Sequence, residues 1–303
     1  MRVFVTGASG WIGSALVPDL LGAGHQVVGL ARSDASAAAL TAAGARVHRG
    51  SLDDLDELRA GAANADGVIH LAFKHDIAFS GGYEAAAAAD LLAVEAIGTA
   101  LAGSEKPFVV TAGTLALAMQ GGVGTERTVI DNALPRIASE HATIALAERG
   151  VRSSVVRLAP SVHGDGDQHG FIARLIEIAR EKGVSGHVGD GSNRWPAVHQ
   201  VDAAQLFRLA LEKAPAGSVL HGVGDEGVPF HEIAGAIGRQ LSLPTAAISP
   251  EDAVNHFGDF ALFVSLDNPT SSALTRELLG WVPTHQSLIE DLDEGHYFRT
   301  RAA

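Results

Sequence analysis

Three glycines, Gly7, Gly10 and Gly13, have the spacing of a phosphate-binding loop. They lie between a short apolar run and a helical pattern, where the first allows a tight turn and the second lets backbone approach a pyrophosphate. The third lets the helix pack closely on the strand, and the helix N-terminus offers free N–H groups to phosphates. The segment predicts dinucleotide binding rather than only a tight turn. The expected contacts are Gly7, Ser9, Gly10, Trp11, Ile12 and Gly13.

The residues after the second apolar run indicate which dinucleotide is bound. An acid there would hold the ribose 2′-hydroxyl of NAD, whereas arginine accommodates the 2′-phosphate of NADP. The chain has Arg32 and Ser33 at this place and no acid before Asp34. Arg32 can pair bidentately with a phosphate and Ser33 can add a hydroxyl, although a solvated surface arginine is the alternative. The pattern favours NADP(H) and leaves NAD(H) open.

The elements that must position these residues follow from an alternation of short apolar runs and helical patterns, typical of a parallel α/β sheet. We expect a Rossmann-type, doubly wound parallel sheet over residues 1–157, with later return segments near 198–223, and a smaller substrate-capping region within 158–303. The predicted strands are Val3–Val5, Gln26–Leu30, Arg46–His48, Gly67–Ala72, Phe108–Thr111, Val151–Arg157 and Val219–Val223. The predicted helices are Trp11–Leu21, Ala35–Ala43, Asp53–Ala60, Tyr83–Leu101, Ala133–Ala147, Phe171–Glu181, Val201–Leu211 and Pro229–Leu241.

Composition excludes several classes of function. The 303 residues include no cysteine, which excludes disulfide scaffolds, thiolate zinc sites and iron–sulfur clusters. The net charge of −13 argues against nucleic-acid and anionic-membrane partners. The most apolar later run, 85–103, contains Asp90 and Glu95 and is a poor membrane span. We expect a cytoplasmic protein with a small-molecule substrate.

The loop Thr6–Gly13 (TGASGWIG) resembles the TGxxGxxG loop of the extended short-chain dehydrogenase/reductases, the NAD-dependent epimerase/dehydratase-like group. Further matches follow in order along residues 1–285: Gly50-Ser-Leu, His70-Leu-Ala, the Arg157–Gly164 segment, Val198–Asp202 and Leu279-Gly-Trp-x-Pro. The resemblance implies further cofactor contacts at Ser51, Leu52, Leu71, Ala72, Phe73, Thr111 and Pro160.

The chain departs from that family at the catalytic residues, which are a Tyr-x-x-x-Lys pair and a serine or threonine. Tyr83 is followed four residues later by Ala87, and Tyr297 by Arg301, so the pair is missing. Alignment on Ser139-Glu140 puts Asn132 and Arg136 at the Tyr and Lys positions, and Gly113 falls at the usual hydroxyl site. The resemblance is therefore to atypical members that lack the standard triad.

Other residues are candidates for the chemistry. His163 is the first choice as proton donor, because histidine titrates near neutrality, with an orienting role as the alternative. Thr111 and Thr114 could hydrogen-bond a substrate carbonyl, or satisfy nearby backbone. We also predict that the substrate contacts His75, Asp76 and Ser161.

Metal and hydrolase chemistry have no support in the sequence. The acidic run from Asp165 to His169 lacks the glutamate that a calcium loop needs at its twelfth position, where Ile176 stands. There is no His-Glu-x-x-His and no Gly-x-Ser-x-Gly, so we expect no metal and no hydrolase activity. The apolar stretch Phe257–Val264 is expected to be core of the cap or the wall of a hydrophobic pocket.

The sequence as a whole predicts an NADP(H)-dependent oxidoreductase that reduces a carbonyl or related group of a small organic molecule. Two alternatives stay open: a nucleotide-sugar epimerase or dehydratase, and a non-catalytic regulator that senses NADP(H). Relatives of this fold often pair through two helices each, so we expect a homodimer through the Ala-rich helices Tyr83–Leu101 and Ala133–Ala147.

Overall fold

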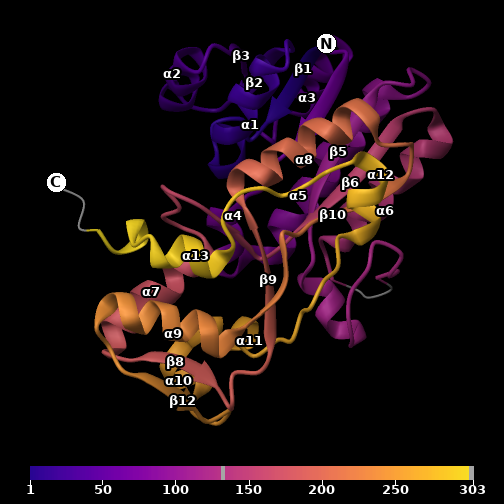
Figure 1. The fold of residues 1–303 in the computed structure, drawn as a ribbon. Helices are drawn as coiled ribbons and strands as arrows, with labels where there is room; N and C mark the ends of the chain where they lie inside the picture. The colour runs from indigo at the N-terminus through magenta and orange to yellow at the C-terminus, as the bar shows by residue number, and fades with distance from the viewer. Residues whose placement is uncertain (131–133, 300–303) are drawn as a thin grey trace.

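A seven-stranded parallel sheet forms the larger part of the molecule in the computed structural model, which describes residues 1–130 and 134–299 (Figure 1). The strand order is β10-β6-β5-β4-β1-β2-β3, so the direction of winding reverses between β1 and β4. The strands are β1 (Arg2–Thr6), β2 (Gln26–Ala31), β3 (Arg46–Arg49), β4 (Gly67–His70), β5 (Pro107–Gly113), β6 (Arg152–Leu158) and β10 (Ser218–Gly222). Ligands of such sheets bind at the carboxyl ends of the strands near this reversal.

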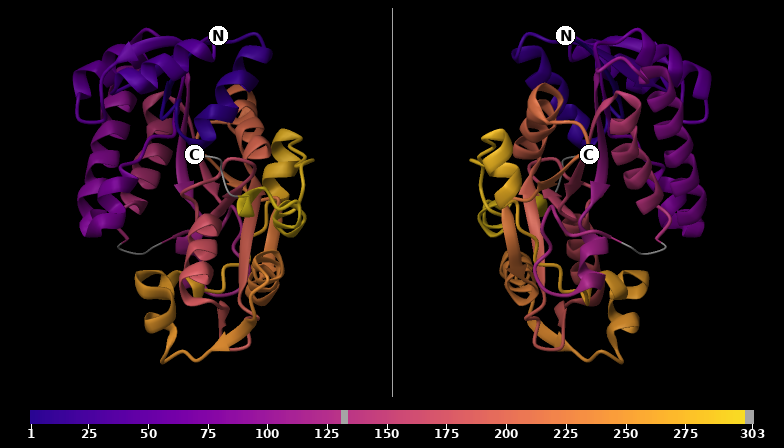
Figure 2. Two further views of the ribbon diagram at one scale, coloured as in Figure 1. Left: turned by 90° about the vertical axis from the view of Figure 1, so that its left-hand side faces the viewer. Right: turned by 90° about the vertical axis from the view of Figure 1, so that its right-hand side faces the viewer.

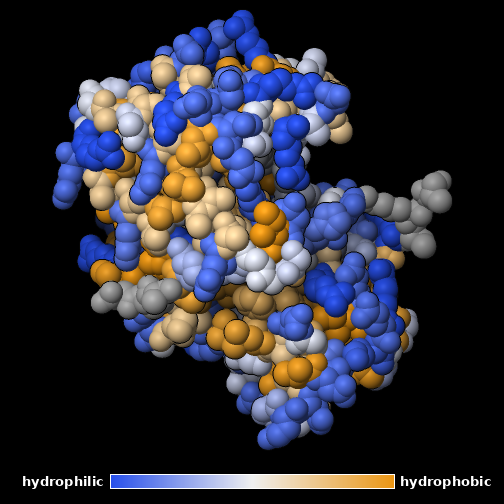
Figure 3. Space-filling view, turned by 180° about the vertical axis from the view of Figure 1, so that it is seen from behind, coloured by the Kyte–Doolittle hydropathy of each residue, from blue (hydrophilic) through white to orange (hydrophobic). Residues whose placement is uncertain are grey.

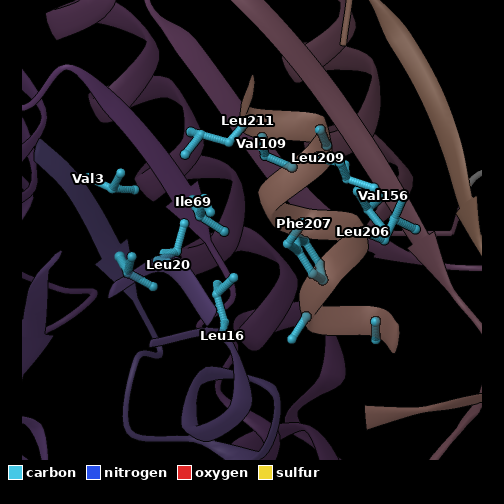
Figure 4. Packing of buried hydrophobic residues seen from close by; sticks show 14 of the residues in the cluster. Val3, Leu16, Leu20, Ile69, Val109, Val156, Leu206, Phe207, Leu209 and Leu211 are labelled. Atoms are coloured by element: carbon cyan, nitrogen blue, oxygen red, sulfur yellow. The ribbon is translucent and has the colours of Figure 1, made fainter. Parts of the chain in front are cut away.

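Helices cover both faces of the sheet because its side chains alternate between the faces. Val3 and Val5 of β1 face a core with α1 (Trp11–Gly22) and α8 (Gln200–Lys213). Figure 4 shows Val3 from close by, with Leu16 of α1 and Phe207 of α8. Phe4, between them, faces the opposite core. That second layer contains α3 (Leu55–Ala63), α5 (Tyr83–Leu101) and α6 (Ile137–Ala145), whereas α2 (Asp34–Ala42) and α12 (Ala273–Leu279) pack on the first core.

The capping region forms the lower lobe of Figure 2 and is built around the buried Trp195. It contains a three-stranded sheet in the order β11-β9-β7 and a two-stranded sheet of β12 and β8. The strands are β7 (Ser161–His163), β8 (Ser185–Val188), β9 (Arg194–His199), β11 (Asp225–Pro229) and β12 (Thr245–Ile248). The helices are α7 (Phe171–Lys182), α9 (Phe230–Leu241), α10 (Ala253–Phe257), α11 (Ala261–Val264) and α13 (Leu288–Asp293).

The predicted fold class is confirmed, and most predicted elements differ from the structure by one to three residues at their ends. β4 ends at His70 rather than Ala72, because its partner β1 ends at Thr6, whose carbonyl accepts the last bond from the Leu71 N–H. The helix predicted over 133–147 begins at Ile137, with Ala133 outside the described residues, and its last turn tightens to a 3₁₀-helix. β10 is the edge strand of the large sheet and α8 packs on it, while the predicted division of the chain into two domains stays a prediction.

The stretch Phe257–Val264 is part of the core of the cap, because Phe257, Ala261 and Val264 are buried in the cluster that contains Trp195. Within the described ranges, no helix is both long and apolar enough to cross a membrane.

Candidate cofactor and active site

The phosphate loop requires glycine at two of the three predicted positions. Gly7 has φ +69°, and a Cβ there would lie 2.7 Å from the backbone N of Ala72. A Cβ on Gly13 would lie 2.3 Å from the carbonyl oxygen of Gly7, so helix α1 can approach the loop only at glycine. Gly10 is the N-cap of α1 and provides no side chain to the first N–H groups. These N–H groups form the anion site expected of a dinucleotide loop.

Trp11 connects this loop to the capping region by a hydrogen bond. Its indole Nε1 donates to the carbonyl oxygen of Val162, 2.8 Å away, and its own carbonyl accepts from the Gln200 amide. Ser9 is exposed on the loop, and Ile12 packs against the first core. The structure thus places Ser9 at the surface of the loop and gives Trp11 and Ile12 packing roles there.

Basic residues lie at the carboxyl ends of β2 and β3. The Arg32 guanidinium is exposed and lies 3.8 Å from an Asp76 carboxylate oxygen. The side chain of Ser33 caps α2 by accepting from the Ser36 N–H. Sequence reasoning missed Arg49, which ends β3 beside β2 and contacts Asp34 at 2.6 Å. The parallel pairing of β2 with β3 brings Arg49 beside the carboxyl end of β2, which the sequence alone does not show.

Two predicted adenosine contacts, Ser51 and Leu52, lie in the turn after β3. The Ser51 hydroxyl donates to Asp54 at 3.0 Å, so it also stabilises the turn. An ion pair of 2.5 Å between Lys74 and Asp53 joins this turn to the segment after β4. Just before Lys74 lie the other predicted cofactor contacts, the half-buried Leu71, Ala72 and Phe73.

A buried polar chain runs behind the phosphate loop, and the sequence reasoning did not find it. Thr6 Oγ1 lies 2.7 Å from His70 Nδ1, and His70 Nε2 lies 3.3 Å from Asp90 Oδ1. All three side chains are at most 1% exposed. Because an ionised carboxylate only accepts, we assign a proton to His70 Nε2. Burial raises the pKa of Asp90, but the His70 hydrogen bond and the nearby positive charges outweigh it and hold the pKa below its usual range.

Arg136 lies at the open end of this chain, where the carboxyl ends of β4 and β5 meet. Its Nε is 4.0 Å from Asp90 Oδ2, and its Nη2 donates to the Thr111 carbonyl at 3.3 Å. Its guanidinium carbon lies 4.0 Å from the centre of the Phe73 ring. On the alignment through Ser139-Glu140, Arg136 falls at the position of the family's lysine, and Asn132, at the tyrosine position, lies outside the described residues.

The predicted catalytic residues are divided among three places. The Thr111 hydroxyl donates to the His70 carbonyl at 2.9 Å and is part of the wall around Arg136. The Thr114 hydroxyl is buried and accepts from the Asn268 amide at 3.2 Å. His163 is buried elsewhere, with Nδ1 2.9 Å from Asp291. Within 1–130 and 134–299, His163 contacts Asp291 and the His199 ring, and forms no hydrogen bond with either threonine.

The surroundings of His163 hold the last helix against the capping region. Asp291 of α13 contacts His163 with one oxygen and His296 with the other, each at 2.9 Å. Burial raises the pKa of Asp291, but its hydrogen bonds to the two histidines outweigh this and lower the pKa. The second nitrogen of His163, Nε2, is buried without a hydrogen-bond partner among the described residues. The role of His163 as proton donor stays a prediction, and this geometry favours a structural role.

The predicted substrate contacts also separate. The His75 ring packs edge-on against Phe73, with centres 5.1 Å apart. Desolvation lowers its pKa, and the positive charge of Arg136 lowers it further. Asp76 instead pairs with Arg32, which directly follows β2. The Ser161 hydroxyl is buried and lacks a hydrogen-bond partner in the described part of the chain, and Pro160 precedes it half-buried.

The two tyrosines do not replace the missing pair directly. Tyr297 donates to Asp167 at 3.1 Å and accepts from Gly164 at 3.3 Å. Burial, with the Asp167 charge, raises the pKa of Tyr297 far above its ordinary value, so this phenol stays protonated. Tyr83, at the start of α5, is 42% exposed and lies near the Phe73 ring.

The fold brings together three potential metal ligands, one of which is far from the other two in the sequence. Ligand atoms of His199, Asp202 and His285 lie within 4.8 Å of one another. The two imidazole rings are stacked, however, with an angle of 6° between their planes, so their in-plane lone pairs cannot converge on one ion. Asp202 is occupied by the N–H groups of Thr284 and His285. This cluster therefore joins α8 to residues 284–285 and is a poor metal site.

Comparison with known proteins identifies the family. Residues 3–221 match the model of the NAD dependent epimerase/dehydratase family, so the chain belongs to that family. A nicotinamide cofactor follows from this membership, and the phosphate loop fits it.

Three relatives illustrate the range of similarity. The chain is 50% identical over 299 residues to "Uncharacterized protein C2A9.02" of Schizosaccharomyces pombe, covering 98% of this chain and 100% of that protein. It is 29% identical over 234 residues to a 2-alkyl-3-oxoalkanoate reductase of Stenotrophomonas maltophilia, covering 73% and 68% of the two chains. The solved structure of MoeE5 in complex with UDP-glucose and NAD has a TM-score of 0.74 at 24% identity, covering 98% and 97%, and shows the fold.

Proposed function

We propose that this protein is an NADP(H)-dependent reductase of a ketone group in a small organic molecule. The observation that carries the choice of cofactor is the pair of arginines, Arg32 and Arg49, at the carboxyl ends of the adjacent strands β2 and β3. A 2′-phosphate near Arg32 would form charge-assisted, bidentate hydrogen bonds that the 2′-hydroxyl of NAD cannot form.

The cofactor would be held by groups spread along the sheet edge. The N–H groups of the loop Gly7–Gly13 would bind the pyrophosphate, and Ser51, Leu52 and Leu71 would surround the adenosine. Ala72, Phe73, Thr111 and Pro160 would line the path toward the nicotinamide. Bound NADPH supplies a hydride to the carbonyl carbon. The protein's task is to orient the carbonyl and stabilise the charge that develops on its oxygen.

Reduction of a ketone is favoured by the name of one relative and by the site. The 2-alkyl-3-oxoalkanoate reductase acts, by its name, on an oxo group beside a carboxylate.

We place the protein in the cytoplasm and expect a homodimer through α5 and α6, which cover the face that Figure 3 shows. A shallow open groove between these helices is lined by Val94, Glu95, Ala142, Ala145, Leu146 and Arg149.

The cofactor proposal is tested by fluorescence titration with NADPH and NADH. We expect Arg32→Ala and Arg49→Ala to weaken NADPH binding by about tenfold, corresponding to about 1.4 kcal/mol, with little effect on NADH. Arg59→Ala is the matched control, because Arg59 lies on α3, where its guanidinium pairs with Asp56 of the same helix. Equal losses for both nucleotides, or none, would contradict the assignment.

The other two functions remain outcomes of an activity assay. A regulator that senses NADP(H) would bind NADPH but would not transfer its hydride to any carbonyl compound. An epimerase or dehydratase would act on a nucleotide sugar without net oxidation of the cofactor. We disfavour this second activity because the tyrosine and lysine of the family's standard chemistry are missing.

A further inference from the structure

Arg136 is a positive charge held in place near the carboxyl ends of β4 and β5. Three contacts hold its side chain: the Thr111 carbonyl at 3.3 Å, the Phe73 ring face at 4.0 Å and the Asp90 carboxylate at 4.0 Å. Thr111 belongs to the end of β5 and Phe73 follows β4, so the guanidinium lies at the sheet edge where ligands of parallel sheets bind. Its side chain is 20% exposed, whereas that of Asp90 is 1% exposed.

The Asp90 carboxylate behind Arg136 is buried and therefore needs a positive partner. Asp90 Oδ2 makes no hydrogen bond within the described ranges, and neither does Arg136 Nε, which faces it. A buried carboxylate requires a positive partner, and Arg136 is the cation paired with Asp90. The other oxygen, Oδ1, is held by His70, which Thr6 orients in turn. Four elements of the chain therefore fix one guanidinium.

We propose that Arg136 is a catalytic residue that hydrogen-bonds the carbonyl oxygen of the substrate and stabilises the negative charge formed there. This inference rests on the proposed ketone reduction. As the carbonyl carbon accepts the hydride with its two electrons, the π pair of the C=O bond moves onto oxygen. Arg136 N–H groups bind that oxyanion, and a proton from solvent water completes the alcohol. A planar guanidinium also suits a ketone with a neighbouring carboxylate or second carbonyl, because two oxygens can share its donors.

Asp90 is a positioning residue in this arrangement. It never contacts the substrate but directs the Arg136 guanidinium and keeps its charge in place. Asp90→Asn retains the size and removes the charge. We expect kcat for ketone reduction to fall about tenfold while the KM for NADPH and the thermal unfolding midpoint change little. A loss of folding stability without this effect on kcat would indicate a structural role alone.

The test of Arg136 uses the full chain and two readouts. The first is kcat/KM for NADPH-dependent reduction of ketones, which we expect Arg136→Ala to lower by about 100-fold or more. Millimolar guanidinium should restore part of that activity saturably, and should do nothing for the wild-type protein. The second readout is the affinity for the ketone in the presence of NADP⁺, where no reduction occurs, and it should fall at least about tenfold.

Arg127→Gln is the matched control, because Arg127 is an exposed arginine of the same connection between β5 and α6. It should leave NADPH affinity, ketone affinity and turnover unchanged. Ketone turnover that persists in Arg136→Ala would overturn the role of Arg136 alone. A wild-type protein that binds NADPH but reduces no ketone would instead overturn the proposed function, and this assignment with it.

Discussion

At the scale of single residues, the site keeps a positive charge at the aligned position of the family's lysine, but a guanidinium carries it. On the alignment through Ser139-Glu140, Arg136 takes the place of the lysine that the family uses beside a tyrosine, and a guanidinium offers planar, paired hydrogen-bond donors. The Asp90 carboxylate, buried behind it, favours a fixed cation over a titrating pair. The protein is thus suited to stabilise an oxyanion by charge and hydrogen bonding.

Asp76 gives a prediction at this scale. Its carboxylate lies 3.8 Å from Arg32 and would repel a 2′-phosphate bound there. We expect Asp76→Asn to strengthen NADPH binding about two- to fivefold at low salt and to leave NADH binding unchanged. Titrations at low and high ionic strength would measure this, because salt screens an exposed interaction. Weaker NADPH binding in the variant would mean that Asp76 orients Arg32 productively.

Residues that act across long sequence distances were beyond the reach of sequence reasoning. Asp90 was noticed only as a charge that interrupts an apolar run, and His70 only as part of a family segment. Their pairing depends on the packing of α5 behind β4, which no local pattern specifies. The available signal was an acid, Asp90, directly after a run of alanines in α5, together with an arginine at the aligned lysine position.

At the scale of elements, the parallel sheet was predictable because each central strand is a short apolar run followed by a helix with a recognisable start. The cap was predicted less well. Strand β7 is three residues long and follows Pro160, and β8 and β12 are four residues each, too short for a clear alternation. Their pairing is decided by tertiary packing around Trp195.

The junction of the phosphate loop with α1 yields a second prediction. A Cβ on Gly13 would press on backbone atoms of Gly7 and Ala8, which cannot move independently of the loop. We expect Gly13→Ala to cost about 1–3 kcal/mol of unfolding free energy and to weaken binding of both nucleotides. Urea unfolding and nucleotide titration would measure the two effects.

Gly22→Ala is the control in the same helix, since a Cβ at Gly22 meets nothing within 4 Å. Alanine there should leave stability unchanged or raise it by about 0.5–1 kcal/mol. If Gly13→Ala behaved like this control, the close approach of α1 to the loop would not matter for binding.

At the scale of the whole molecule, buried histidines join late parts of the chain to the central sheet and make stability depend on pH. His221 of β10 lies 2.8 Å from the Ser271 carbonyl, before α12. Burial lowers the pKa of His221 to about 4, and Arg157 adds to this effect. The Ser271 hydrogen bond and the Glu126 and Glu140 charges oppose it only in part.

The sign of the pH effect follows from that lowered pKa. The unfolded chain takes up a proton on His221 below about pH 6.5, but the folded protein does so only near pH 4. The stability that this histidine contributes is therefore complete above pH 6.5 and is lost as the pH falls toward 4. We expect His221 to account for about 2 kcal/mol of the difference in unfolding free energy between pH 7 and pH 5.

Urea unfolding of His221→Asn at the two pH values measures this contribution. Asparagine can still donate to the Ser271 carbonyl but does not titrate, so the difference between pH 7 and pH 5 should shrink by that amount. His141→Asn, at an exposed histidine of α6, should leave the difference unchanged. An undiminished pH dependence in His221→Asn would assign the effect to other groups.

The central claim is that the family's fold here reduces ketones with NADPH although its tyrosine and lysine are missing. The most direct measurement is kcat/KM for reduction of a panel of ketones, including 3-oxo acids and their esters, with NADPH and with NADH in parallel. We expect turnover of at least one ketone, with NADPH preferred about tenfold or more. NADPH binding without turnover of any ketone, or a preference for NADH, would contradict it.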